Sequence, residues 1–117
     1  MSYYGVIVLV MTKRRRYEMS FVEVGNNKVS TLLYSKSTGE RGEEGRKKGY
    51  RIDVFPGMTH DQLPVWYVAV RWGRAEQSQG WWQVQVKSFQ TQQQAMNFAW
   101  EKYYAKIDKG YEEGLVR

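Results

Sequence analysis

The feature that most constrains the fold is a strict alternation of side chains over residues 65–72. Large apolar side chains occupy every second position there, and the positions between them hold Tyr67, Ala69 and Arg71. A two-residue period is that of a β-strand, whose successive side chains point to opposite faces of a sheet. A second alternating run begins after Gly80, with Trp82, Val84 and Val86 at one parity. The two runs predict an antiparallel hairpin joined by a loop at 75–80.

Further runs predict the rest of the sheet. Apolar or alternating stretches occur at 3–11, 17–22, 29–34 and 50–54, and each is short enough for one strand. Gly25, Asn26 and Asn27 separate two of these runs, and such residues tolerate the positive φ of a tight hairpin turn. We therefore expect most neighbouring strands to pair antiparallel.

One helix is predicted near the C-terminus. Thr91 with Gln94 three residues later forms a capping box, residues 92–109 lack Gly and Pro, and Gly110 stands where a left-handed cap belongs. At 100° per residue one broad apolar stripe results, comprising Ala95, Met96, Ala99, Trp100, Tyr103 and Ile107. The predicted fold is α+β, a mostly antiparallel sheet with this helix packed on one face.

The chain has 117 residues and therefore forms one domain, residues 1–117, that can bury a core of its own. Residues 35–49 contain four glycines, a basic run and no apolar side chain to bury, which predicts a flexible polar loop. Pro56 and Pro64 bound a second loop that holds His60, the single histidine.

The residue types needed for most catalytic and metal sites are missing from the sequence. It has no cysteine, one histidine and no phosphate-binding glycine loop, so it offers no thiol nucleophile, histidine triad or Cys/His zinc site. The pairs Glu43–Glu44 and Glu112–Glu113 fall in polar segments typical of solvated side chains. We expect a protein that is not an enzyme and that uses no metal or cofactor.

Positive charge is concentrated in one part of the chain. Of 18 basic and 12 acidic residues, 11 and 5 fall in residues 1–51, whereas residues 52–117 hold 7 of each. This imbalance suggests a polyanionic partner. The apolar run at 3–11 is shorter than the roughly 18 residues of a membrane span, and its charges follow it, which reverses the order of a secretory signal. We expect a soluble, cytoplasmic protein with no membrane partner.

Residues 70–74 read Val-Arg-Trp-Gly-Arg at the end of the predicted strand. They are followed at suitable distances by Gly80, Phe89, Ala95, Lys106 and Tyr111. This arrangement resembles the WGR domain, a module of DNA-dependent poly(ADP-ribose) polymerases and of short bacterial proteins. The resemblance covers residues 66–111, and 26–28 resemble the start of the family's Asn-Lys strand. Relative to the family, residues 35–63 form an insertion.

The resemblance implies binding of a DNA end without base specificity. Trp72 would pack on the terminal sugar, and Arg74 would make a charge-assisted contact with a 5′ phosphate. Gly73 would serve as a structural residue of the triplet. The remaining nucleic-acid-binding residues would be Asn27, Lys28, Lys106, Tyr111 and Trp81. The family's ADP-ribosyl transfer resides in a separate domain and is not implied.

Two questions stay open at the level of sequence. Strand parity groups Trp72 with Val68 and Val70, which favours a core residue, and the same parity directs Arg74 inward at a cost in desolvation. A bulge at Gly73 would re-aim both neighbours. Besides a DNA-end binder, with DNA favoured over RNA, the sequence allows a protein-interaction module using the Trp72/Arg74 surface and a general single-strand binder.

Overall fold

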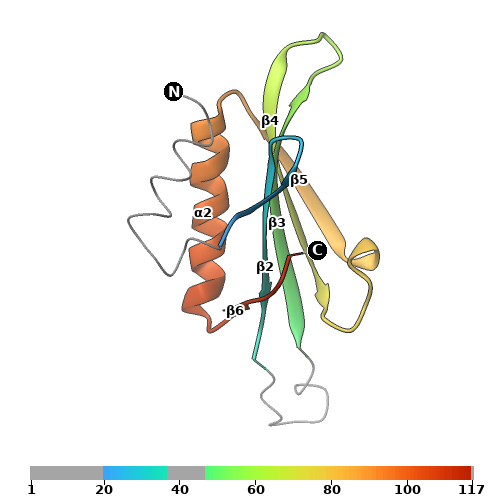
Figure 1. Cartoon of the computed structure of the whole chain (residues 1–117), viewed down its shortest axis with the longest axis vertical. Coiled ribbons are helices and arrows are strands. Elements are labelled where there is room, and N and C mark those ends of the chain that lie inside the picture. The colour runs from blue at the N-terminus through green and yellow to red at the C-terminus, as the bar shows by residue number, and fades with distance from the viewer. Residues whose placement is uncertain (1–19, 37–46, 117) are drawn as a thin grey trace.

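The computed structural model of this chain describes residues 20–36 and 47–116 (Figure 1). The strand predicted at 3–11 and most of the polar loop predicted at 35–49 lie outside these residues. The elements in chain order are β1 Val22–Gly25, β2 Lys28–Tyr34, β3 Lys48–Met58, β4 Pro64–Arg74, η3 Gln79–Trp81, β5 Gln83–Phe89, α2 Gln92–Asp108 and β6 Glu112–Glu113.

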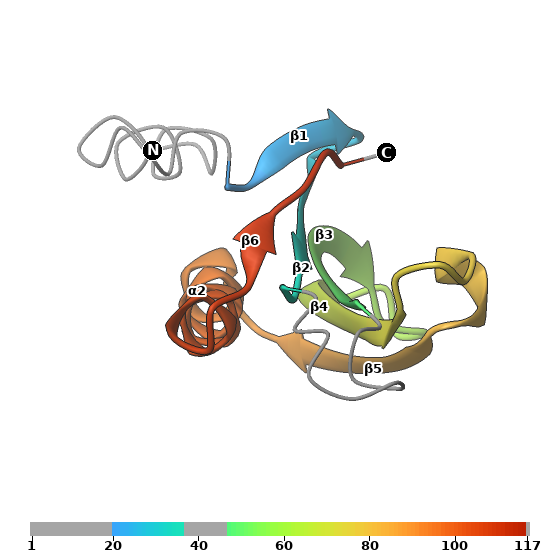
Figure 2. The ribbon, with the colours of Figure 1, turned by 90° about the horizontal axis from the view of Figure 1, so that it is seen from below.

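The sheet is antiparallel throughout, with the strand order β1-β2-β3-β4-β5. The short strand β6 pairs with the end of β2, on the edge that β1 occupies nearer its start. Helix α2 packs along one face of the sheet, chiefly against β3 and β4 (Figures 1 and 2). The predicted α+β architecture is therefore confirmed.

The core lies between α2 and the sheet. Side chains of alternating strand positions meet the apolar stripe of the helix, as the two periodicities require. The buried residues of this cluster include Val29, Leu33, Tyr50, Ile52, Val54, Val68, Val70, Ala95, Met96, Ala99 and Tyr103. Trp100 and Ile107, also predicted for the stripe, pack against it while partly exposed.

Both helix caps form as their residues predict. The amide of Gln94 donates to Oγ1 of Thr91 at 3.2 Å, and the side chain of Gln94 accepts from the amide of Thr91 at 3.3 Å. At the other end, Gly110 adopts φ +93°. The β1–β2 hairpin is likewise confirmed, because Asn26 and Asn27 have φ of +53° and +63° between paired Gly25 and Lys28.

The strand predicted at 17–22 is wrong at Ser20 and Phe21, and of its described residues only Val22 belongs to a strand, as the first residue of β1. Ser20 and Phe21 precede β1 and are both buried, whereas a half-buried strand would expose one of them. Ser20 Oγ donates to the hydroxyl of Tyr103 at 3.0 Å, and the Phe21 ring meets Trp100 edge-on with centroids 4.7 Å apart. Packing against α2 has outweighed the local alternation.

β3 is longer than the sequence predicts. It begins at Lys48 and Gly49, which were expected in the polar loop, and continues through Pro56 and Gly57 to Met58. Proline is tolerated because β2 pairs with β3 only as far as Val54, so beyond that point β3 has one partner strand. The segment interpreted as an insertion thus contributes a central strand.

No helix within residues 20–36 and 47–116 has the length and apolar character needed to span a membrane.

Candidate functional site

A cavity of about 480 Å³ opens where the last turn of α2 approaches the ends of the central strands. We call it the cation cavity. Three strands, the η3 turn and the segment after α2 contribute to its walls. Its lining residues are Lys48, Gly49, Tyr50, Trp72, Gly73, Arg74, Gln77, Trp81, Trp82, Gln83, Lys106 and Tyr111.

The strand that carries Trp72 and Arg74 runs straight through Gly73. Its pairing with β3 continues without a shift, so that Gly73 lies opposite Gly49 and Arg74 opposite Lys48. The bulge predicted at Gly73 is therefore wrong. Trp72 and Arg74 share one face of β4, and no charge is buried because Arg74 is exposed at the strand end.

The two glycines are explained by Trp82, which the sequence reading did not assign to the site. Its ring lies across the Gly49–Gly73 pair, so that a Cβ atom on either would come within 2.1 Å and 2.5 Å of it, respectively. Trp82 is 4% exposed, and its Nε1 donates to the carbonyl of Arg74 at 2.9 Å. Glycine at 73 thus leaves room for the indole, whose hydrogen bond fixes the backbone of Arg74. Gly49 lies outside the Trp-Gly-Arg triplet, and it is the sequence signal that could have indicated the same contact.

The end of α2 brings a lysine and a tyrosine together. The amide of Tyr111 donates to the carbonyl of Lys106 at 3.0 Å, and the amide of Gly110 donates to Ile107 at 2.9 Å, which is a Schellman motif. The motif turns the chain back so that Tyr111 lies beside Lys106. The ammonium of Lys106 then lies 4.7 Å from the ring centroid of Tyr50 and 5.0 Å from that of Tyr111. Both distances are within the range of a cation–π contact.

Positive charge dominates the cavity electrostatically. Burial, followed by repulsion from Lys109, Lys48 and Lys102, lowers the pKa of Lys106. Among the residues that the structure describes, no Asp or Glu lines the cavity. An anion entering it would offset both causes of the shift, because it would lie next to a partly desolvated cation that otherwise has cationic neighbours.

The tyrosines of the cavity stay protonated to higher pH than usual. Burial, followed by interaction with Tyr111, raises the pKa of Tyr50, and burial raises that of Tyr111. Neutral hydroxyls leave the rings as uncharged surfaces for Lys106. The cavity therefore gains no negative charge in the neutral range.

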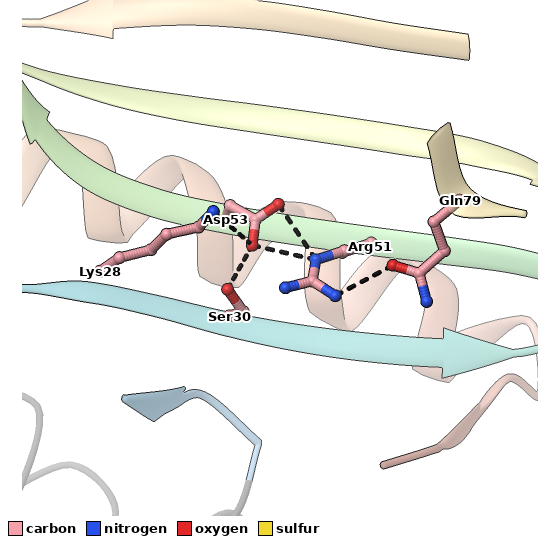
Figure 3. A network of polar contacts seen from close by, with 5 residues as sticks. All are labelled: Lys28, Ser30, Arg51, Asp53 and Gln79. Carbon is pink, nitrogen blue, oxygen red and sulfur yellow. Dashed lines mark hydrogen bonds and ion pairs between the residues drawn. The ribbon is translucent and has the colours of Figure 1, made fainter. Parts of the chain in front are cut away.

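Trp81 stands at the rim on the η3 turn and is 83% exposed. The turn is anchored on the sheet face away from α2. There Arg51 donates to the side-chain oxygen of Gln79 at 2.9 Å (Figure 3). Arg51 is itself fixed by Asp53, whose two carboxylate oxygens accept from its Nε at 3.0 and 3.2 Å. An exposed indole is thus presented on an anchored turn.

Asn27 and Lys28 lie elsewhere. Lys28 pairs with Asp53 at 3.9 Å and lies 5.7 Å from the ring centroid of Phe55, on the sheet face opposite α2 (Figure 3). It lines a separate hollow of about 510 Å³ with Arg51 and Phe55. Of the seven predicted nucleic-acid-binding residues, the cation cavity gathers five, namely Trp72, Arg74, Trp81, Lys106 and Tyr111.

Trp72 combines the two alternatives that the sequence left open. It packs against the core cluster from one side and lines the cavity from the other, with intermediate exposure. A tryptophan supported in this way is held in place by the core while part of its ring surface remains available to a ligand.

Metal-binding chemistry finds little support in the described part of the chain. Within it, no group of three His, Cys, Asp or Glu side chains could hold a metal ion. His60 lies in the β3–β4 loop, 94% exposed, with its Nε2 3.3 Å from a carboxylate oxygen of Asp61.

Comparisons of the chain with the models of known protein families, with curated proteins and with solved structures found no match.

Proposed function

We propose that this chain is a non-catalytic module that binds nucleic acid through the cation cavity, and that its preferred ligand is a DNA end bearing a 5′ phosphate. The observation that carries the proposal is the setting of Lys106. This cation lies between two tyrosine rings, in a cavity that also gathers Lys48 and Arg74 and that no described carboxylate lines.

The charge of the cavity favours a terminal phosphate over an internal one. A phosphate monoester carries about −1.5 to −2 charges near neutral pH, whereas a diester carries one. Lysine and arginine donors gain most from such a group through charge-assisted hydrogen bonds. The pKa depression of Lys106 adds to this preference, because a more negative ligand relieves more of the repulsion from Lys48 and Lys109.

The shape of the cavity and its aromatic side chains suit the end of a strand. A volume of about 480 Å³ admits a nucleotide-sized group but not a duplex. Trp72 and Trp81 offer flat apolar surfaces beside the cations, and stacking or packing on such rings contributes about 1–3 kcal/mol per base without reading the sequence. The resemblance to WGR domains supports the same ligand and would make the chain a member with an additional central strand.

The experiment compares two lysine substitutions of equal charge. Both Lys106 and Lys28 lie over aromatic rings, but only Lys106 lines the cation cavity. We expect Lys106→Met to weaken binding to a 5′-phosphorylated duplex by about 10- to 100-fold, the equivalent of one charge-assisted hydrogen bond. Lys28→Met should change it by less than about twofold.

Three DNA substrates and a salt series complete the test. Affinity should be highest for the phosphorylated duplex, lower for the dephosphorylated one and lowest for a closed circle. With Lys48, Arg74 and Lys106 contacting phosphate, log K should fall against log salt with a slope of about −3, and Lys106→Met should reduce that slope by about 1. Equal affinity for all three substrates would exclude end recognition. Stronger competition by single strands would indicate a single-strand binder instead.

A further inference from the structure

Strand β5 forms an open edge of the sheet. It is the last strand in the order, and no strand of the described residues pairs with its outer side (Figures 1 and 2). Six of its seven residues are exposed, among them Val84 at 48% and Val86 at 53%. An edge of this length presents a row of backbone donors and acceptors to any second strand that approaches.

Most of the devices that protect a sheet edge are missing from β5. The strand holds no Pro or Gly, and its register with β4 continues without a bulge from Gln83 to Phe89. Its single charged residue is Lys87, whose ammonium lies 5.0 Å from the ring centroid of Phe98 on α2. A lysine directed over the helix side of an edge strand discourages pairing, and Lys87 is the one device of this kind on β5.

We propose that two copies of this chain pair through β5, antiparallel and about a two-fold axis at Val86. This axis is the one that pairs all seven residues of the strand. It places Val86 opposite its counterpart, Gln85 opposite Lys87, Val84 opposite Ser88 and Gln83 opposite Phe89. A closed two-fold contact of this kind uses the same surface on both copies.

The side chains of β5 complement themselves in that register. Val84 and Val86 lie on the face away from α2, because the pairing with β4 puts Gln85 and Lys87 on the face of the buried residues Val68 and Val70. The paired strands would therefore join the exposed valines across the axis and set each Lys87 beside a neutral glutamine. Moving the axis to Gln85 would leave Ser88 and Phe89 opposite residues outside the strand.

Charge substitutions at two neighbouring positions of the same face test this register. Gln85→Glu would create two Glu–Lys pairs per dimer, and Gln85→Lys would create two Lys–Lys contacts. We expect the dimer dissociation constant, measured by sedimentation of the full chain at several concentrations, to fall by about 2- to 30-fold in the first variant and to rise similarly in the second. Gln83→Lys carries the same added charge but faces Phe89 and should leave the constant within about twofold.

Salt provides a second readout. Each chain carries a net charge of +6, so the unmodified protein should dimerise more strongly as salt screens this repulsion. The difference between Gln85→Glu and Gln85→Lys should shrink over the same range. The measurement uses no nucleic acid and is therefore independent of the proposed function.

Two outcomes would overturn the proposal. A chain that sediments as a monomer at every concentration has no such contact, as expected if another part of the chain covers the edge. A dimer that responds equally to Gln83→Lys and Gln85→Lys pairs elsewhere or in another register. Circular dichroism of each variant checks that the fold is retained. We expect it to be retained because the substituted side chains are exposed.

Discussion

Gly73→Ala is the substitution that most directly tests how the cation cavity is built. The added Cβ would lie 2.5 Å from Cδ1 and 2.8 Å from Cγ of Trp82. The indole cannot stay in place, so its hydrogen bond to the carbonyl of Arg74 at 2.9 Å is lost with it. Overpacking costs about 1–3 kcal/mol and a hydrogen bond about 1 kcal/mol, so we expect the free energy of unfolding to fall by about 2–4 kcal/mol. Urea denaturation followed by circular dichroism measures this change.

A double-mutant cycle separates the clash from other effects of the methyl group. In a Trp82→Ala background the clash partner is absent, and alanine at 73 should then stabilise the strand by about 0.5–1 kcal/mol, because glycine is the weaker strand former. Gly80→Ala serves as the control, since its Cβ would meet only Ser78 Oγ, at 3.8 Å. If alanine at 73 cost as much without the indole as with it, the contact between Trp82 and Gly73 would not be the reason for glycine there.

Three further predictions concern stability, each measured by urea denaturation. Asp53→Ala removes the carboxylate that accepts from Arg51, which is 7% exposed, and should cost about 3–5 kcal/mol. Lys28→Ala removes a partly exposed partner of Asp53 and should cost less than about 1 kcal/mol. Burial raises the pKa of Tyr50, so above about pH 10 the unfolded chain loses this proton first and stability falls as pH rises; Tyr50→Phe should make that fall shallower. Thr91→Ala removes the helix cap and should cost about 1 kcal/mol.

Local sequence signals predicted those parts of the fold that local contacts determine. The caps at Thr91 and Gly110 and the turn at Asn26–Asn27 form as expected, because each depends on residues within five positions of one another. Segment 20–21 did not follow its own alternation, because a contact with Tyr103, distant in sequence, decides where Ser20 lies. The extension of β3 through Pro56 is possible because β2 stops pairing with β3 at Val54, whereas β4 continues to pair with it. The register between these strands is set by the whole sheet and not by residues near Pro56.

The candidate site was predictable in part for the same reason. Trp72 and Arg74 follow from strand parity once β4 is known to run straight, and Lys106 and Tyr111 follow from the helix cap that joins them. The aromatic partner that completes their setting, Tyr50, comes from a strand more than fifty residues earlier, and no local pattern links it to them. Trp82 was missed because the alternation assigns it to a face of β5 without saying what that face meets.

Lys28 and Lys106, both expected from the resemblance to bind nucleic acid, show that strand register determines which residues can share a site. Lys106 lies over Tyr50 and Lys28 lies over Phe55, and both rings belong to β3. Five residues of a strand span about 17 Å, and an odd separation puts the two rings on opposite faces. No ligand the size of the cation cavity contacts both ammonium groups. One phosphate can therefore report on one of these lysines only, and comparing Lys106→Met with Lys28→Met tests which face of the sheet receives the ligand.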